Sequence, residues 1–236
     1  MKKNKLVILI GSPGSGKGAQ AFLLSGQKKM IHLEASKLLE KKFLYALEGE
    51  SDNVSVDGKN YSLLKQKELW SSGHLCEDGF VAFVVKEAVE NMKKGVEAIL
   101  LDGYPRTIKQ AELTIPFLFS FYEPSDILVI SLEVTEEESI RRNTKRRVCS
   151  LMRHSIIDHK ETKNLTICPL DGSLLEKRIL DNEKTIKVRL KDFKKMTAPV
   201  VDYFEKKGIF VARIDGMGTI NDVYRRVLLK LEEFGL

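Results

Sequence analysis

Long apolar runs and cysteines are both scarce in this sequence. No apolar stretch approaches the ~20 residues that a membrane-spanning helix needs, and charged residues make up 31% of the 236 residues, so a membrane protein is not expected. Three cysteines, a small and odd number, argue against a disulfide framework and indicate reduced thiols or a metal site. The start MKKNKLVILI has the lysines of a signal peptide, but its apolar run covers only residues 6–10 before a glycine. A buried β-strand in a cytoplasmic protein is the better interpretation.

The sequence also lacks a concentrated basic region. The net charge is +6, yet the lysines are scattered and no aromatic-rich basic stretch is present, so nucleic acid is not an expected partner. A basic surface suits small polyanions such as nucleotides equally well. Hydrophobic residues make up 43% of the chain, which is enough for one well-buried core, alone or with a small appended module.

Short apolar runs alternate with helical patterns along the chain. Four runs that are typical of buried parallel strands lie at 5–11, 97–102, 125–134 and 208–215. Helical patterns follow at 16–25, 135–147 and 220–234. The alternation predicts an α/β fold with a parallel sheet flanked by helices. Ligands of such sheets lie beyond the carboxyl ends of the strands, where the glycines at 11–18, Asp102 and Asp215 also fall.

Two segments interrupt this alternation. Residues 34–92 read as mainly helical, broken by the polar stretch 49–62. Residues 148–178 hold two cysteines and two histidines and show little helical periodicity. Both segments are predicted to be insertions into the core.

The stretch GSPGSGKGAQ at 11–20 has the features of a phosphate-binding loop. Its glycines let backbone N–H groups turn toward an anion, and the helix that follows adds its positive N-terminal end. Lys17 would reach the β- and γ-phosphates. The common phosphate loop places a hydroxyl directly after the lysine to hold Mg²⁺, whereas Gly18 and Ala19 stand here. The candidate nucleotide-binding residues of the loop are Gly14, Ser15, Gly16, Lys17, Gly18 and Ala19.

A second motif, LLDGYPRTIKQAE, covers residues 100–112. Asp102 ends a predicted strand, where its carboxylate is placed to hold Mg²⁺ through water. Gly103 permits close backbone approach, and the planar guanidinium of Arg106 suits a phosphate group. Each feature is weak alone, but together with the loop they indicate phosphate chemistry.

The two motifs together resemble the signatures of adenylate kinases and their nucleoside monophosphate kinase relatives. In that family the loop reads G-x-P-G-x-G-K-G-T-Q, so Ala19 departs from it at the hydroxyl position. The resemblance implies a P-loop NTPase-type fold with a five-stranded parallel sheet. It also implies a core made of 1–33, 93–147 and 179–236, a helical insertion at 34–92 that binds the acceptor nucleotide, and a mobile lid at 148–178.

The same resemblance assigns donor-side residues in three further stretches, 141–148, 176–208 and 214–223. Arg142 and the backbone near Gly218 are expected at the adenine, and Asp102 at Mg²⁺ through water. The family's acidic pair in the lid arm is half kept, since Leu180 replaces the first acid and Asp181 remains. The residues expected to hold phosphates in catalysis are Lys17, Arg106, Arg146, Arg178 and Arg189.

The acceptor segment departs from the family pattern S-T-G-D-[LM]-L-R. An ungapped count gives EASKLLE at 34–40, with Ala35 at the threonine and Glu40 at the arginine. An acid where a phosphate dianion should bind is repulsive, unless Lys41 or Lys42 supplies the charge through a shifted register. The stretch at 71–80 resumes the pattern, so Gly73 joins the expected acceptor set. The other expected acceptor residues are Ala35, Glu40, His74, Leu75, Cys76, Gly103, Tyr104, Arg106 and Gln110.

The lid resembles the zinc-binding lids of bacterial relatives, which carry C-x-x-C…C-x-x-[CD]. Here the spacing gives Cys149-x-x-Met152 and Cys168-x-x-Asp171. Methionine is a poor zinc ligand, so we expect substoichiometric zinc or none and a lid held by apolar packing. The alternative is a zinc site in which His154 or His159, instead of Met152, supplies the fourth ligand.

The leading interpretation is a phosphotransferase that moves the γ-phosphate of ATP·Mg²⁺ to a nucleoside monophosphate, with AMP as the default acceptor. One alternative is the same chemistry on another phosphate acceptor, and a second is a non-catalytic nucleotide-binding member of the family. The family resemblance implies a monomer.

Overall fold

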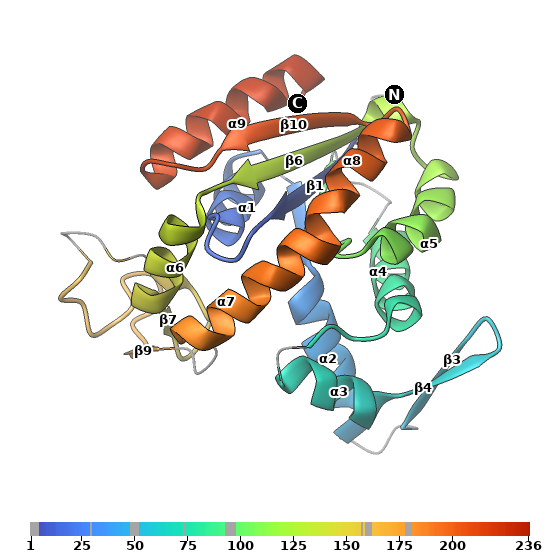
Figure 1. The fold of residues 1–236 in the computed structure, drawn as a ribbon, viewed down its shortest axis with the longest axis horizontal. Coiled ribbons are helices and arrows are strands. Elements are labelled where there is room, and N and C mark those ends of the chain that lie inside the picture. The colour runs from blue at the N-terminus through green and yellow to red at the C-terminus, as the bar shows by residue number, and fades with distance from the viewer. Residues whose placement is uncertain are drawn as a thin grey trace.

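The computed structural model describes residues 5–28, 30–47, 52–72, 74–92, 98–156, 158, 162–177 and 181–236. Strands from these ranges form a five-stranded parallel sheet in the order β10-β6-β1-β5-β2 (Figure 1). This is the P-loop NTPase-type α/β fold that the sequence predicts. The five strands are β1 (Lys5–Gly11), β2 (Met30–Glu34), β5 (Ala98–Asp102), β6 (Ile127–Glu133) and β10 (Phe210–Asp215).

Helices cover both faces of the sheet. Because successive side chains of a strand point to opposite faces, Val7 and Leu9 pack with one buried cluster and Leu6 and Ile8 with another. The first cluster includes side chains of α1 (Lys17–Gln27) and α9 (Ile220–Phe234). The second includes side chains of α4 (Asp78–Met92), α5 (Ile108–Phe119) and α8 (Ala198–Lys206). A short 3-10 helix, η1 (Pro124–Asp126), precedes β6.

The edge strand β2 places an unexpected residue beside Asp102. β2 pairs with β5 from Met30↔Ala98 to Glu34↔Asp102. The sequence analysis located only four strand runs, and MIHLE was not among them. Its pairing brings the Glu34 backbone next to the end of β5.

Residues 34–92 contain a β-hairpin as well as helices. The elements before α4 are α2 (Ala35–Leu47), β3 (Asn53–Val56), β4 (Lys59–Ser62) and α3 (Leu63–Ser71). The polar stretch that was expected only to interrupt helices therefore includes two paired strands. Asp57 and Gly58 form the turn with φ of 49° and 79°, the left-handed geometry that tight hairpins need. Tyr61 is buried and packs against Phe80, which fixes the hairpin on the insertion.

A second small sheet lies beyond α6 (Glu136–Lys145). Its strands are β7 (Arg147–Cys149), β8 (Ser155–Ile156) and β9 (Leu175–Glu176), in the order β8-β7-β9. The chain then returns through α7 (Glu183–Asp192), a π-helical turn η2 (Phe193–Thr197) and α8, which together run from this small sheet across the main sheet (Figure 1). None of the helices in the described ranges combines the length and the apolar character of a membrane span.

Candidate functional site

The glycine-rich loop joins β1 to α1 at the carboxyl end of the sheet. Gly14 and Gly16 have φ of 76° and 96°, which side chains rarely adopt, and a Cβ at Gly14 would lie 2.4 Å from Nδ2 of Asn143. Gly16 is the N-cap of α1, so the loop lies at the positive end of that helix. Lys17, Gly18 and Ala19 form the first turn.

Lys17 points back over its own loop. Its ammonium donates to the carbonyl oxygens of Gly11 at 2.6 Å and Ser12 at 2.9 Å. Burial lowers the pKa of Lys17 to about 8. The loop therefore holds a cation whose charge titrates just above neutral pH.

Charged residues from three other parts of the chain surround Lys17. The positive charges of Arg106, Arg189 and Arg146 lower its pKa further, whereas the carboxylate of Asp102 raises it. Asp102 is the last residue of β5, and Arg106 follows that strand. Arg146 directly follows α6, and Arg189 lies in α7. The fold thus brings five of the residues predicted from the sequence together around the phosphate loop.

Arg142 connects three segments on the donor side. Its guanidinium donates to the carbonyl of Gly216 at 3.0 Å, and more weakly to those of Gly14 and Gly218 at 3.4 Å. Glu138 holds the same side chain through Nε at 2.6 Å. The phosphate loop, α6 and the loop after β10 therefore meet at Arg142.

Asp181 links two of the predicted catalytic arginines. It accepts a bidentate pair of bonds from Arg146 at 2.7–2.9 Å, and Arg189 lies 3.8 Å away. The Asp181 side chain is 2% exposed. A charge-assisted bidentate pair of this kind fixes the plane of the guanidinium, so Asp181 sets where Arg146 points.

Asp102 ends β5 beside His32 of β2. The carboxylate lies 3.4 Å from Nε2 of His32, and the residue is 6% exposed. The carboxylate that is expected to hold Mg²⁺ through water is therefore nearly buried and lies next to the phosphate loop.

The other predicted residues after β5 form one hydrogen-bonded corner. Arg106 donates from Nε to the carbonyl of Gly103 at 2.9 Å, and its backbone N–H donates to Oε1 of Gln110 at 2.7 Å. Tyr104 is buried, and its hydroxyl contacts Thr114 and the carbonyl of Gln110. These hydrogen bonds hold Arg106 beside the end of β5, close to Lys17.

The expected acceptor residues of 34–92 differ in their exposure. Ala35 and Cys76 are buried, at 4% and 6% exposed, whereas His74 is exposed and Leu75 is half-buried. The Cys76 thiol donates to the carbonyl of Gln66 at 3.4 Å. Burial raises the pKa of Cys76 to about 11, so the thiol is neutral at neutral pH.

The sequence analysis missed the acid that faces Arg106. The carboxylate of Glu34 is close enough to stabilise the charge of Arg106, as is that of Asp102. Glu34 also accepts from the Ser36 hydroxyl at 2.5 Å and lies 3.4 Å from the Lys37 ammonium. Its position opposite Asp102 follows from the pairing of β2 with β5, which no local pattern revealed.

The structure describes the surroundings of two residues that the sequence analysis weighed for the acceptor charge. Glu40 is exposed. Lys42 lies 3.5 Å from Glu87 and 5.6 Å from the ring of Phe83, both in α4. Lys42 therefore points toward α4. Lys37 instead forms an ion pair with Glu34, the carboxylate that also lies near Arg106.

Four metal-ligating side chains meet in the small sheet. Cys149, His154, Cys168 and Asp171 place one ligand atom each within 4.8 Å of all the others. Cys149 Sγ lies 3.6 Å from Nδ1 of His154 and 3.0 Å from Oδ2 of Asp171, and Nδ1 lies 3.5 Å from Cys168 Sγ. The thiol of Cys149 lowers the pKa of the Asp171 carboxyl by hydrogen bonding.

This cluster corrects one premise of the sequence analysis. Met152 is 57% exposed and contacts the cluster only through its backbone N–H, which donates to Asp171 at 3.3 Å, while His154 occupies the fourth position. The turn at 150–153, with Arg153 at φ 59°, carries the chain past Met152 and returns it at His154. The spacing is therefore Cys-x₄-His rather than Cys-x₂-Met. Four of the residues named from the sequence, Gly73, His159, Arg178 and Leu180, lie outside the described residues.

A glycine-rich loop under a ring of arginines, at the carboxyl ends of a parallel sheet, is the architecture of a P-loop kinase acting on phosphorylated substrates. The comparisons with known proteins agree with this class. The family model for adenylate kinase matches residues 9–209. The chain is 32% identical to an adenylate kinase of Clostridium acetobutylicum, over 94% of this chain and 96% of that protein. It is 31% identical to one of Methanothrix thermoacetophila, over 97% and 99%, and 32% identical to one of Staphylococcus aureus, over 94% and 96%.

The chain therefore belongs to the adenylate kinase family. It is an enzyme of the nucleoside monophosphate kinase class, a phosphotransferase, as the two sequence motifs predicted.

Proposed function

We propose that this protein transfers the γ-phosphoryl group of ATP to AMP. The observation that carries this proposal is the gathering of Lys17, Arg106, Arg146 and Arg189 around one loop mouth, with Asp102 among them. Phosphoryl transfer needs positive charge on the moving group and two substrates held in line, with little covalent help. The acceptor is already an anion, so no general base is required.

The donor nucleotide is assigned to the phosphate loop and the Arg142 junction. The N–H groups of residues 14–19 would hold the β- and γ-phosphates with Lys17. The adenine would lie against Arg142 and the backbone near Gly218, which Arg142 already contacts at 3.4 Å. Arg146 and Arg189, positioned by Asp181, would bind the transferred phosphoryl group. Arg178 is proposed beside them from the family resemblance alone.

Asp102 fits the Mg²⁺ that accompanies ATP. Its carboxylate is a hard oxygen donor at a strand end next to the loop, and water can connect it to the ion. Bound Mg²⁺ neutralises charge on the phosphates. Ala19 has no hydroxyl to offer, so Asp102 is the protein's proposed contact with the hydrated ion.

The acceptor is assigned to the region between Arg106 and the first turn of α2. Gln110 and Cys76 would face its base, with Gly103, Tyr104, His74 and Leu75 around them. Arg106 would bind its phosphate, and Lys37 would add the second positive charge in place of Lys41 or Lys42. Support comes from the Lys37–Glu34 pair at 3.4 Å, which holds this ammonium on the Arg106 side of α2.

Residues 34–92 and 148–178 are proposed to move over the acceptor and the donor. Closure would exclude water, which would otherwise accept the phosphoryl group. The core between them would consist of 1–33, 93–147 and 179–236. A cytoplasmic location and a monomeric state stay predictions, and sedimentation velocity tests the second.

An ADP-release assay with ATP and a panel of nucleoside monophosphates tests the proposed function. We expect turnover with AMP, and loss of about 10²-fold or more in Lys17→Met, because the charge on the phosphates is removed. Lys28→Met, at the end of the same helix, is the matched control and should keep its activity. Near-native turnover of Lys17→Met on any acceptor would refute the loop assignment. Turnover only with another monophosphate would refute AMP as the acceptor.

We also propose that Zn²⁺ binds Cys149, His154, Cys168 and Asp171. Zinc with bonds of about 2.0–2.3 Å in a tetrahedron holds its ligand atoms roughly 3.3–3.8 Å apart. The separations of 3.0, 3.5 and 3.6 Å here are close to that range. Thiolate, imidazole and carboxylate are all accepted zinc ligands. Bound zinc would cross-link β7 to the 167–172 loop and stabilise the small sheet.

Metal analysis of protein purified without chelator tests this site. We expect about one zinc per chain, where the spacing alone had predicted substoichiometric zinc or none. His154→Ala should lose most of the metal, since three ligands remain. Met152→Ala is the control and should keep it. Full zinc in His154→Ala, or loss in Met152→Ala, would contradict the assignment.

A further inference from the structure

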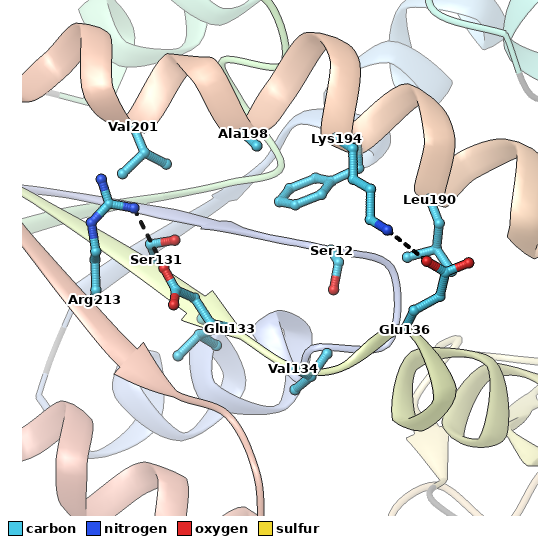
Figure 2. A pocket seen from close by; sticks show the side chains of 12 residues that line it. Ser12, Ser131, Glu133, Val134, Glu136, Leu190, Lys194, Ala198, Val201 and Arg213 are labelled. Carbon is cyan, nitrogen blue, oxygen red and sulfur yellow. Dashed lines mark hydrogen bonds and ion pairs between the residues drawn. The ribbon is translucent and has the colours of Figure 1, made fainter.

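A pocket of about 220 Å³ lies beside the phosphate loop, with Ser12 among its lining residues (Figure 2). The end of β6 and the start of α6 form one side of it, and α7, the π-helical turn and α8 form the other. The nucleotide roles proposed above do not use it. Its lining combines a buried hydroxyl, an apolar wall and two differently charged ends, and each of these restricts what could bind there.

The buried hydroxyl belongs to Ser12. This residue is 7% exposed, and its Oγ finds no hydrogen-bond partner among the described residues. A buried polar group without a partner is costly. Ser12 lines the pocket, so water or a polar atom of an occupant can reach its hydroxyl there. The carbonyl of Ser12 already accepts from Lys17 at 2.9 Å, which places the pocket directly against the loop.

The wall opposite is apolar and comes from the long helix. Leu190, Ala198 and Val201 lie on the side of the pocket opposite Val134 (Figure 2). Phe193, from the same long helix, also lines the pocket. Phe193 begins the π-helical turn η2, and such turns often occur at functional sites. The middle of the pocket therefore suits a hydrocarbon chain or a ring.

The two ends carry opposite charge. At one end, Arg213 is already shared by Glu133, Asp202 and Glu205, which leaves an excess of negative charge. At the other end Lys194 pairs with Glu136 at 2.6 Å. An adjoining hollow there is lined by Glu136, Lys187, Lys191, Lys194 and Lys195.

The lysine end therefore keeps unpaired positive charge. Lys191 and Lys195 have no ion-pair partner within the ranges that the structure describes, and Lys187 pairs with Glu183 outside the hollow. An occupant with a single anionic group would place it here, because the other end repels it.

We propose that this pocket binds a small amphipathic anion, an aromatic or aliphatic carboxylate, with its apolar body against Phe193 and its carboxylate toward Lys191 and Lys195. A dry cavity of about 150 Å³ accommodates a benzene ring, so 220 Å³ suits one ring with a short chain. A nucleotide is too large and too highly charged for it. The assignment does not depend on which monophosphate the enzyme phosphorylates.

Titration of the ¹⁵N-labelled full chain with 3-phenylpropionate tests the proposal, with a bisubstrate dinucleoside polyphosphate present to fill the nucleotide sites. We expect shift changes confined to 12, 131–136 and 190–201, and a Kd of about 1 mM, which is usual for a ligand of about ten non-hydrogen atoms. Uncharged 3-phenylpropan-1-ol should bind about tenfold more weakly. Equal affinity of the two compounds would overturn the assignment of the charged end.

Two variants locate the site. Ala198→Leu should abolish the shifts by filling the pocket, and the charge reversal Lys191→Glu/Lys195→Glu should weaken binding about tenfold or more. Lys206→Glu/Lys207→Glu, farther along the same helix and outside the pocket, should bind like the parent. The proposal would be overturned if binding survived Ala198→Leu or the Lys191/Lys195 reversal. It would also be overturned by shift changes elsewhere in the protein, or by no shift changes up to about 20 mM ligand. The charge-reversal pair keeps the test decisive if Ala198→Leu misfolds.

Discussion

Glu34 stands at the end of β2, opposite Asp102 in the sheet and within reach of the charge of Arg106. Two carboxylates therefore share the side of the cleft that is proposed to receive a phosphate dianion. Lys37 neutralises Glu34 only in part, because its side chain is 61% exposed and screened by water. The acceptor cleft is consequently less positive than its single arginine suggests.

Replacement of Glu34 by serine should improve acceptor binding. We expect the KM for AMP to fall about tenfold, a change of ~1.4 kcal/mol, with kcat little changed, because repulsion is removed equally from the bound and transition states. Steady-state kinetics measure both constants. Glu40→Gln is the matched control and should shift KM by less than about twofold, since Glu40 is exposed. A larger effect of Glu40→Gln would mean that Glu40, as the ungapped count implied, faces the phosphate.

The affinity for the donor should depend on the protonation of Lys17. Its pKa of about 8 in the free enzyme lies below the usual value because of burial and the neighbouring Arg106, Arg146 and Arg189. Bound phosphate favours the charged form, so the pKa rises on binding. Affinity is then constant below pH 8 and falls by up to about tenfold per pH unit above it.

Calorimetric titration with a non-hydrolysable ATP analogue between pH 6 and 9.5 measures this dependence. Lys17→Arg is the control, because a guanidinium keeps its charge throughout that range. Its affinity should stay flat with pH. The same fall in Lys17→Arg would assign the titration to another group.

At the scale of single residues, local motifs were sufficient for the donor side. Asp102 ends a buried strand and Lys17 lies in the loop-to-helix motif after another, so their position at the carboxyl edge could be predicted. Glu34 was not predicted, and His154 was named only as one of two alternatives to Met152. Glu34 depends on strand pairing across 68 residues of chain, from 34 to 102, and His154 depends on a turn that displaces the ligand by two positions.

Among the elements, the strongly apolar strands and the amphipathic helices were predicted correctly, and the weaker strands were missed. The run predicted as a helix at 16–25 corresponds to α1 (Lys17–Gln27). β2 was missed because MIHLE includes a histidine and a glutamate, and lies at the edge of the sheet. The hairpin was missed although Asp57-Gly58 is a strong turn signal, because its strands are four residues each and mostly polar.

The two arms of the proposed lid are joined by Asp181, and this gives a prediction for α6, β7 and α7. Asp181→Asn weakens the bidentate pair with Arg146, so hydrogen exchange in β7 and the first turn of α7 should increase in the free enzyme. Bisubstrate nucleotide should lower exchange across 147–177 in the parent protein. Glu183→Gln, which breaks an exposed pair with Lys187, is the control and should change little. Unchanged exchange on bisubstrate binding would contradict lid closure.

The main sheet and the small sheet bury very different amounts of apolar surface. Both faces of the main sheet carry large clusters, from Leu6 to Ile209 and from Val7 to Leu231. Among the described residues, the buried cluster at the small sheet consists of Cys149, Ile156 and Cys168, with Leu175 packed against it, and Val148 of β7 is buried as well. A cluster of this size cannot hold a sheet together by burial alone, so the small sheet should depend on the zinc proposed above.

Removal of the metal should therefore unfold the small sheet and leave the main sheet intact. In chelator-treated protein we expect amide exchange at 147–156 and 165–176 to approach that of an unfolded chain, because bound zinc supplies the folding free energy of such a module. The main calorimetric transition should move by less than about 2 °C, since the buried cluster of the small sheet is separate from the two main clusters and the contact of Phe22 with His154 involves an exposed ring. Cys149→Ser should reproduce the effect of the chelator, and Cys76→Ser, which removes a buried thiol outside the small sheet, should not. A fall of more than about 5 °C in the main transition on chelation would show that the two parts unfold as one unit. Slow amide exchange that persists in the small sheet after chelation would show that packing alone holds the lid.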